Sequence, residues 1–397
     1  MSAILCLLAA LQDPDLAALP DNAWAKLPTP AVHAMVRSGS PWMPYAPDAD
    51  VAFVWGAGHS QPHNDLWSYS LARNEWKELL KTEPSAAQDA GVLKEKDGVV
   101  MTRKERPLSA HQWGQMDYDP DRKLLWYYPA LLWQGVYDIR TQAKVAKEGP
   151  ERKEPKGPTL WTYDLQTNTW AWVHTEDPSR ICSTYGAGTG TFRYFPPLKK
   201  FVMVMGMKGD PNVFRLFDPD TRRWEPLKVA GPAVHAWACA PMVYDSKRKL
   251  LLLNSTRQTH GTLLLDPAKK TVEEIVPADR TPFGNLDGNC GVHVYDSAAG
   301  TMLAIYTKAN FKVYDAYKGF EKKGWPHDET SVWALDVEKK EWILQPAPSN
   351  GVRPTRAKDA MSHAYYDPAR NVTFIYEGSY NGMDGEAWAY RFRKSKP

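Results

Sequence analysis

Cysteine, long apolar runs and excess charge of either sign are scarce in this chain. Its 397 residues include four cysteines, and Cys182, Cys239 and Cys290 lack a CxxC spacing, which supports neither a zinc site nor a disulfide framework. No segment reaches the roughly 18 consecutive apolar residues of a membrane-spanning helix. The net charge of +3 is too small to indicate nucleic-acid binding. Phosphate-binding glycine loops, GxSxG elbows and HExxH motifs are absent, so we expect no metal and no cofactor.

Aromatic residues are plentiful, and they recur at regular positions. The chain has 17 Trp and 19 Tyr, and 43% of its residues are hydrophobic, which is enough for a large core. The following short turns open on a tyrosine: Tyr45-Ala46-Pro47, Tyr118-Asp119-Pro120, Tyr194-Phe195-Pro196, Tyr244-Asp245-Ser246, Tyr295-Asp296-Ser297 and Tyr366-Asp367-Pro368. Successive tyrosines are 73, 76, 50, 51 and 71 residues apart. A bare period of about 50 residues indicates stacked supersecondary units.

Each turn is followed by an apolar run of strand length and then by a segment typified by Trp-x-Tyr-Asp. The apolar runs are 51–55, 123–127, 201–205, 250–253, 302–306 and 372–376, and the second segments are 67–69, 161–164, 215–218, 263–266, 333–336 and 388–390. Nine residues after five of these second segments begin stand Trp76, Trp170, Trp224, Val272 and Trp342. A constant spacing across a polar turn predicts a third strand hairpinned to a fourth.

The sixth unit cannot complete this pattern, because nine residues beyond Trp388 is the last residue, Pro397. A Trp-containing strand, Ala23-Trp24-Ala25-Lys26-Leu27, lies near the other end of the chain with nothing before it to pair with. Joining it to the last unit would leave no long sheet edge exposed. The sequence therefore predicts an all-β fold over residues 22–397: a single six-bladed β-propeller of four-stranded antiparallel blades, closed by an N-terminal strand in the last blade.

These motifs resemble those of the Kelch-repeat β-propellers, including the central domain of galactose oxidase, over essentially residues 22–397. The glycine pair that the family places after the second strand survives only as Gly56-Ala57-Gly58 and Gly206-Met207-Lys208-Gly209, and the fourth unit lacks both tryptophans. The resemblance implies the propeller architecture. Exported members of the family include a sialic-acid epimerase and copper-dependent galactose oxidases, but the copper-ligand pattern of the oxidases cannot be matched here.

The N-terminal segment has the features of a short export signal. Residues 3–11 form an apolar run that an alanine-rich segment follows, although no Lys or Arg precedes it. We interpret residues 1–18 as a signal peptide and expect a secreted or periplasmic protein. The alternative is an apolar tail that packs under the propeller.

Three intervals between units are about 20 residues longer than the bare repeat. The extra residues fall at Thr82–Arg106 after blade one, at Tyr137–Pro158 inside blade two and at Asn310–Thr330 inside blade five. Long loops on a rigid scaffold commonly carry recognition. The blade-five insertion contains Phe311, Tyr317 and Trp325, and it either packs on the face of the ring or forms a platform for a ligand.

A ring of polar residues is expected at the mouth of the central channel, because innermost strands precede each opening tyrosine. These residues are Arg37, His111, Tyr185, His235, Asp287 and Lys358. His260, in the corresponding loop of blade four, could join a pocket on the same face. Such a mixture of cations, carboxylate and imidazoles could bind an acidic sugar or transfer protons.

Two functions from different classes fit these features. The first is an exported binding module that holds a glycan or a protein on its loop face, as a monomer and without nucleic acid or a membrane span. The alternative is a carbohydrate-active enzyme of the epimerase or polysaccharide-lyase type, in which His111 or His235 acts as base and Arg37 shields a carboxylate. A cytosolic adaptor is a third reading, which the signal disfavours. Whether the protein is an enzyme stays open at this point.

Overall fold

The structure is a computed structural model of the chain. It describes residues 15–36, 42–56, 63–83, 93–96, 99–107, 114–128, 160–176, 191–204, 214–232, 234, 241–254, 261–277, 292–306, 330–355, 360–379 and 382–393. All structural statements below concern these residues.

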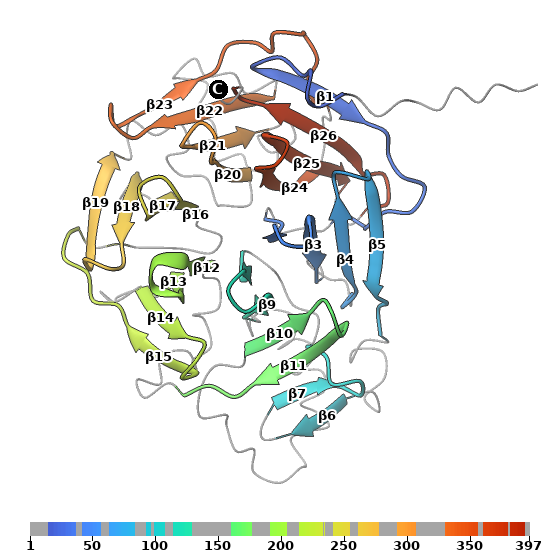
Figure 1. Cartoon of the computed structure of the whole chain (residues 1–397), viewed down its shortest axis with the longest axis vertical. Coiled ribbons are helices and arrows are strands. Elements are labelled where there is room, and N and C mark those ends of the chain that lie inside the picture. Colours follow the sequence, from blue (N-terminus) through green and yellow to red (C-terminus); the bar gives the residue numbers. More distant parts are fainter. Residues whose placement is uncertain are drawn as a thin grey trace, which may run out of the picture.

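Six four-stranded antiparallel sheets surround a common axis, as Figure 1 shows, and they confirm the predicted six-bladed propeller. Blade one contains β2 (Tyr45–Ala46), β3 (Val51–Trp55), β4 (Leu66–Ser70) and β5 (Glu75–Leu80), and blade two contains β8 (Met116–Asp119), β9 (Leu124–Tyr127), β10 (Leu160–Asp164) and β11 (Thr169–Val173). Blade three contains β12 (Thr191–Phe195), β13 (Lys200–Val204), β14 (Phe214–Asp218) and β15 (Arg223–Pro226), and blade four contains β16 (Met242–Asp245), β17 (Leu250–Asn254), β18 (Thr262–Asp266) and β19 (Thr271–Val276). Blade five contains β20 (Val292–Asp296), β21 (Thr301–Tyr306), β22 (Ser331–Asp336) and β23 (Glu341–Leu344).

Blade six joins the two ends of the described chain. It contains β24 (Ala360–Asp367), β25 (Val372–Ser379), β26 (Glu386–Arg391) and, as its outermost strand, β1 (Ala23–Leu27). β1 pairs antiparallel with β26, and Trp24 lies directly opposite Tyr390 with the ring centroids 4.6 Å apart. The predicted closing strand is therefore present, and β26 has no free edge.

The constant nine-residue spacing reflects a cross-strand apolar pair between the third and fourth strands, which is aromatic on both sides in blades one, two and three. Tyr69 lies opposite Trp76, Tyr163 opposite Trp170, Phe217 opposite Trp224 and Leu335 opposite Trp342, and blade four has Leu265 opposite Val272. These rings are buried between neighbouring blades, where six apolar clusters hold the blades together. Aromatic pairs of this kind stabilise sheets through both area and geometry.

Three of the opening tyrosines connect their blade to the one before it. The hydroxyl groups of Tyr118, Tyr194 and Tyr295 donate to Asp48, Asp121 and Asp245, which lie in the first hairpin of the preceding blade. Burial and these carboxylates raise the pKa of each tyrosine, which keeps the hydroxyl protonated as a donor. In blades two, three and five, the opening tyrosine therefore fastens the blade to the one before it.

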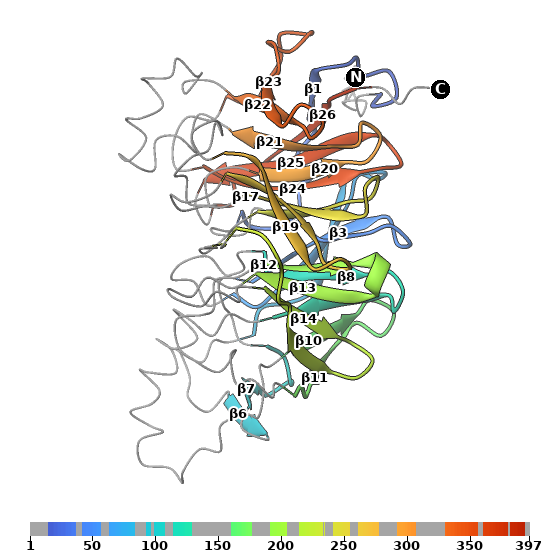
Figure 2. The same cartoon turned by 90° about the vertical axis from the view of Figure 1, so that its left-hand side faces the viewer.

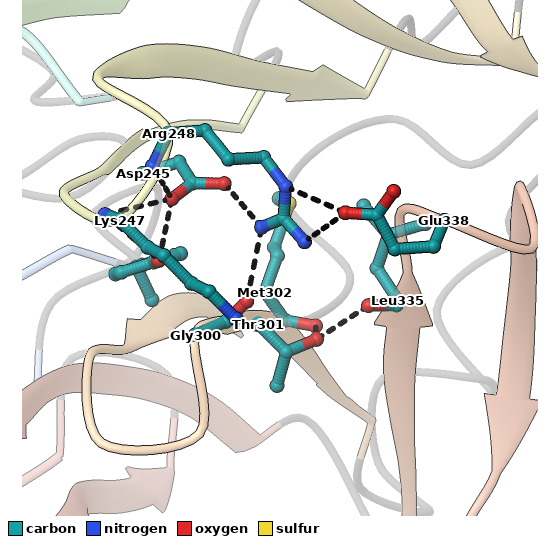
Figure 3. A network of polar contacts seen from close by, with 9 residues as sticks. Asp245, Lys247, Arg248, Gly300, Thr301, Met302, Leu335 and Glu338 are labelled. Carbon is teal, nitrogen blue, oxygen red and sulfur yellow. Dashed lines mark hydrogen bonds and ion pairs between the residues drawn. The ribbon is translucent and has the colours of Figure 1, made fainter.

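A second set of contacts, which we call the Asp-Arg latches, occurs in blades two, four and six. The buried Asp119, Asp245 and Asp367 each bind the arginine three residues later, and the N–O distances are 2.7, 2.8 and 2.6 Å. Each arginine also reaches an acidic residue of the following blade: Asp220, Glu338 or Asp50. Figure 3 shows the latch of blade four, where Arg248 lies between Asp245 and Glu338.

One element was not expected from the sequence. The insertion at Thr82–Arg106 contains a hairpin of β6 (Leu93–Lys96) and β7 (Val99–Thr102), outside the ring and next to β11 in Figures 1 and 2. Its base is fixed to blade one through Glu83, which accepts from the Thr102 hydroxyl at 3.0 Å and pairs with Arg106 at 3.3 Å. This insertion is therefore an attached structural unit in part, and the prediction of a simple loop there was wrong.

The two faces of the ring differ in how the strands are connected. On one face, here called the turn face, strands are joined by four-residue turns such as 120–123 and 165–168, whose last residue has a positive φ. The opposite face, here called the loop face, takes the longer connections, including 128–159 from β9 to β10 and 307–330 from β21 to β22. The side view in Figure 2 separates the two faces. The three predicted insertions all leave from the loop face.

Candidate functional site

The residues that the sequence singled out lie outside the described part of the chain. This applies to Arg37, His111, Tyr185, His235, Asp287, Lys358, Phe311, Tyr317, Trp325 and His260. They therefore remain predictions, and the candidate site consists of residues that the structure describes.

Buried polar side chains are found at the ends of the strands that meet the loop face. Thr191, Asn254, Thr262, His293, Ser362 and Glu377 are all buried there. Between this loop-face end and the latches on the turn face, the buried residues of the sheets are mostly apolar. A polar layer at one end of a sheet costs stability unless it is hydrogen-bonded, so its position is consistent with a functional loop face.

Arg193 of β12 lies at the axis of the ring and contacts three blades. Its Nε donates to the carbonyl oxygen of Met242 in blade four at 2.8 Å, and its Nη1 donates to Gly114 at 2.8 Å in blade two and to Phe192 at 2.7 Å. Only 4% of Arg193 is exposed. Innermost strands have backbone groups without a sheet partner on their inner edge, and this guanidinium satisfies several of them.

Trp42 covers this guanidinium from the other side of the axis. The segment before β2 runs beside β24, because Trp42 forms a parallel bridge with Ala364 and the N–H of Met43 donates to Ala364 at 3.0 Å. From there the indole ring reaches blade three and lies 4.4 Å from the Arg193 guanidinium carbon. Stacking of a desolvated cation on tryptophan is favourable by ~2 kcal/mol. Trp42 and Arg193 together cross the centre of the ring.

Asp117 of β8 is a buried carboxylate that interacts electrostatically with Arg193. Its two oxygens accept the backbone N–H groups of Tyr118 at 3.0 Å and of Tyr194 at 2.8 Å, which joins blades two and three. The surrounding ring removes most of its hydration and raises its pKa to about 6, although Arg193 acts in the opposite direction. Desolvation also lowers the pKa of Arg193 to about 10, so this side chain is charged at neutral pH.

The raised pKa of Asp117 predicts a pH-dependent contribution to stability. The folded protein holds this proton more tightly than the unfolded chain, so stability falls as pH rises from about 4 to about 6 and is then constant. Asp117→Asn loses one acceptor for the N–H groups of Tyr118 and Tyr194 at every pH, but it has no carboxyl to ionise, so its stability relative to the natural protein should rise by about 1–3 kcal/mol between pH 4.5 and pH 7.5. Urea unfolding of both proteins at the two pH values measures this difference. An equal difference at both pH values would contradict the prediction.

Two buried imidazoles, those of His293 and His363, lie near the loop face, and their surroundings do not favour proton exchange. Burial lowers the pKa of His293 to about 3, so this ring is neutral at physiological pH and lies edge-on to Tyr306. His363 is fully buried and stacked on Tyr376, whose hydroxyl donates to Ala34 at 2.6 Å. A general base must exchange protons with a substrate, which these enclosed rings do not favour.

The described residues form neither a metal-ion cluster nor a membrane-spanning helix. They contain no group of three or more His, Cys, Asp or Glu residues placed to hold a metal ion. Nor does any helix among them have the length and hydropathy to cross a membrane.

Fold and site together define a six-bladed β-propeller whose axis is crossed by a tryptophan and an arginine. The chain matches no protein-family model and no curated protein. It is similar to a structural genomics protein of unknown function from Bacteroides thetaiotaomicron, with 10% identity over 94% of this chain and 74% of that chain and a TM-score of 0.47. YjhT gives 12% identity, coverage of 90% and 94%, and a TM-score of 0.48.

TolB from Acinetobacter baumannii is similar at 12% identity and a TM-score of 0.42, and the match covers 86% of this chain but 65% of TolB. Identities and TM-scores in this range support no argument about function. The function has to be inferred from the chain itself.

Proposed function

We propose that this protein is an exported, Kelch-like binding module that holds a glycan or protein ligand on its loop face. The observation that supports it most is the asymmetry of the ring. The turn face has short turns fastened by tyrosines and latches, whereas every long connection leaves from the loop face. A rigid scaffold with variable loops on one side is the usual arrangement of a recognition surface.

The axis of the ring agrees with this proposal. Trp42 stacked on Arg193 places an indole and a cation on the axis of the ring. Aromatic rings and arginine are the side chains most enriched at the energetic centres of binding sites.

A ligand screen tests the proposal. The purified protein is applied to a glycan array and used to capture proteins from an extracellular fraction, next to a variant without residues 310–330. We expect a ligand whose binding is weakened at least tenfold by the deletion and unchanged by Glu338→Ala on the turn face. Binding that survives the loop deletion and is lost in Glu338→Ala would place the site on the wrong face.

The enzymatic alternative gives a different result in the same preparation. Turnover of uronic-acid substrates that disappears in His111→Ala and His235→Ala would replace the binding module with an epimerase or lyase. Cell fractionation tests export separately, and protein confined to the cytosol would overturn that part of the proposal.

A further inference from the structure

One nitrogen of the Arg193 guanidinium, Nη2, differs from the other two in its hydrogen bonding. Its hydrogen bonds to carbonyl oxygens use Nε and Nη1, and Nη2 makes no hydrogen bond to a described residue. Nη2 lies against Gly114, where an added Cβ would be 3.2 Å away, and Gly114 has a φ of +90° that other residues rarely adopt. Glycine at this position therefore leaves room for the guanidinium itself, which a Cβ would crowd.

The charge of Arg193 is also incompletely balanced. Among the residues that the structure describes, no carboxylate lies within ion-pair distance of the guanidinium, in contrast to Arg122, Arg248 and Arg370 on the turn face. Asp117 acts on it only across a longer distance. Carbonyl dipoles solvate a buried cation but do not neutralise it, so an oxyanion that could reach Nη2 would gain a charge-assisted hydrogen bond.

We propose that Nη2 of Arg193, between Gly114 and Trp42 on the axis of the ring, binds one oxyanion of a ligand that enters from the loop face. This inference rests on the proposed function and adds the chemical class of the ligand, which is one with a carboxylate or phosphate group. The stacked Trp42 holds the guanidinium plane in place, so little side-chain freedom is lost when the anion binds.

Asp117 gives this site a distinctive response to pH. The groups that face its carboxyl are Arg193 and Tyr194 on β12 and Tyr118 and Asp119 on its own strand. Ionised Asp117 competes with a ligand anion for the field of Arg193, and protonated Asp117 does not. Anion affinity should therefore be highest below the Asp117 pKa of about 6 and should fall at higher pH.

The test compares three probes that share one ring: glucose, glucuronate and glucose 6-phosphate. Binding is followed through the indole N–H resonance of Trp42, assigned by its loss in Trp42→Phe. We expect an anionic probe to bind at least tenfold more tightly than glucose at pH 5.5. Glucuronate, whose charge is constant in this range, should bind several-fold more weakly at pH 7.5 than at pH 5.5. A preference for glucuronate identifies a carboxylate site, and a preference for glucose 6-phosphate identifies a phosphate site.

Two variants separate the site from a general effect of charge. Asp117→Asn should bind the anion more tightly at pH 7.5 and lose the pH dependence, while Arg193→Lys should weaken it at least tenfold because the planar fork is lost. Equal affinity for glucose and the anions, or anion binding unaltered in Asp117→Asn, would overturn the inference, even if Arg193→Lys fails to fold. A glycan-array ligand that binds the loop face irrespective of its charge would leave the proposed function standing and remove only this inference.

Discussion

Replacing Asp245 with alanine should destabilise the propeller by about 3 kcal/mol, which is one of the largest effects expected on the turn face. The carboxylate is fully buried and accepts from the backbone N–H groups of Lys247 at 3.0 Å and Arg248 at 2.9 Å. It also binds Nη1 of Arg248 at 2.8 Å and the hydroxyl of Tyr295 in blade five (Figure 3 shows the Arg248 side). Alanine would leave all four donors without this acceptor. The midpoint of urea unfolding measures the loss.

Glu338→Ala is the matched control for that experiment. Glu338 binds the same arginine at 3.0 Å, but 81% of its side chain is exposed, and exposed ion pairs contribute between zero and about 1 kcal/mol. The two substitutions therefore remove acidic partners of one arginine from opposite environments. Similar losses in the two variants would show that the latch acts through its exposed half, contrary to our interpretation.

The Asp-Arg latches also explain why an aspartate and an arginine three residues later recur in alternate blades, which a four-stranded sheet alone does not require. Asp119, Asp245 and Asp367 occupy the same place in alternate blades, and each arginine reaches across to the blade that follows. Blades one, three and five each receive one of these arginine contacts. In the opposite direction, the tyrosine hydroxyl groups of blades three and five donate to carboxylates of blades two and four. Such reciprocal contacts make a ring of weakly related blades cooperative.

The architecture could be predicted from the sequence because the residues that repeat are the ones that fasten blades together. In blades one, two, three and five, the tryptophan of the fourth strand lies at a fixed spacing from its partner on the third strand, which a count along the chain can detect. The closing strand was predictable for the same reason, since Trp24 is the partner that Tyr390 lacks in its own hairpin. The spacing of residues along the chain is sufficient to predict the architecture where the same contact repeats in several blades.

The β6–β7 hairpin was missed although its sequence contained a signal. Asp97-Gly98 separates two four-residue strands, and Asp-Gly is a frequent dipeptide of two-residue hairpin turns. In the sequence, residues 82–106 stood out only as an insertion after blade one. A hairpin outside the repeat has no periodic partner, so only its turn could reveal it.

The axial residues were missed for a different reason. Arg193, Asp117 and Trp42 each occur once, and their significance depends on contacts between blades that lie far apart in the sequence. The sequence did mark Arg193 weakly, as a charge within the otherwise uncharged strand β12. Channel residues were instead sought several positions earlier, at His111 and His235, whose placement lies outside the described residues.

Trp24→Ala should destabilise the protein by about 3–5 kcal/mol, because it removes the largest side chain of the closing strand. Trp24 is 1% exposed and packs in the cluster between blades five and six. Its backbone is held from blade five as well, where the Asn350 side chain donates to its carbonyl oxygen at 2.7 Å. The free energy of unfolding, measured with urea, should fall by this amount.

Lys26→Ala, on the same strand, separates loss of packing from loss of pairing. Lys26 keeps the same backbone pairing with β26, but half of its side chain is exposed, and its ion pair with Glu386 spans 2.9 Å at the surface. We expect a loss of no more than about 1 kcal/mol there. If Trp24→Ala behaved like Lys26→Ala, backbone pairing alone would close the ring and the aromatic pair would be dispensable. If closure depends on the indole, Trp24→Ala should also increase hydrogen exchange in β26, since a released β1 exposes the edge of that strand.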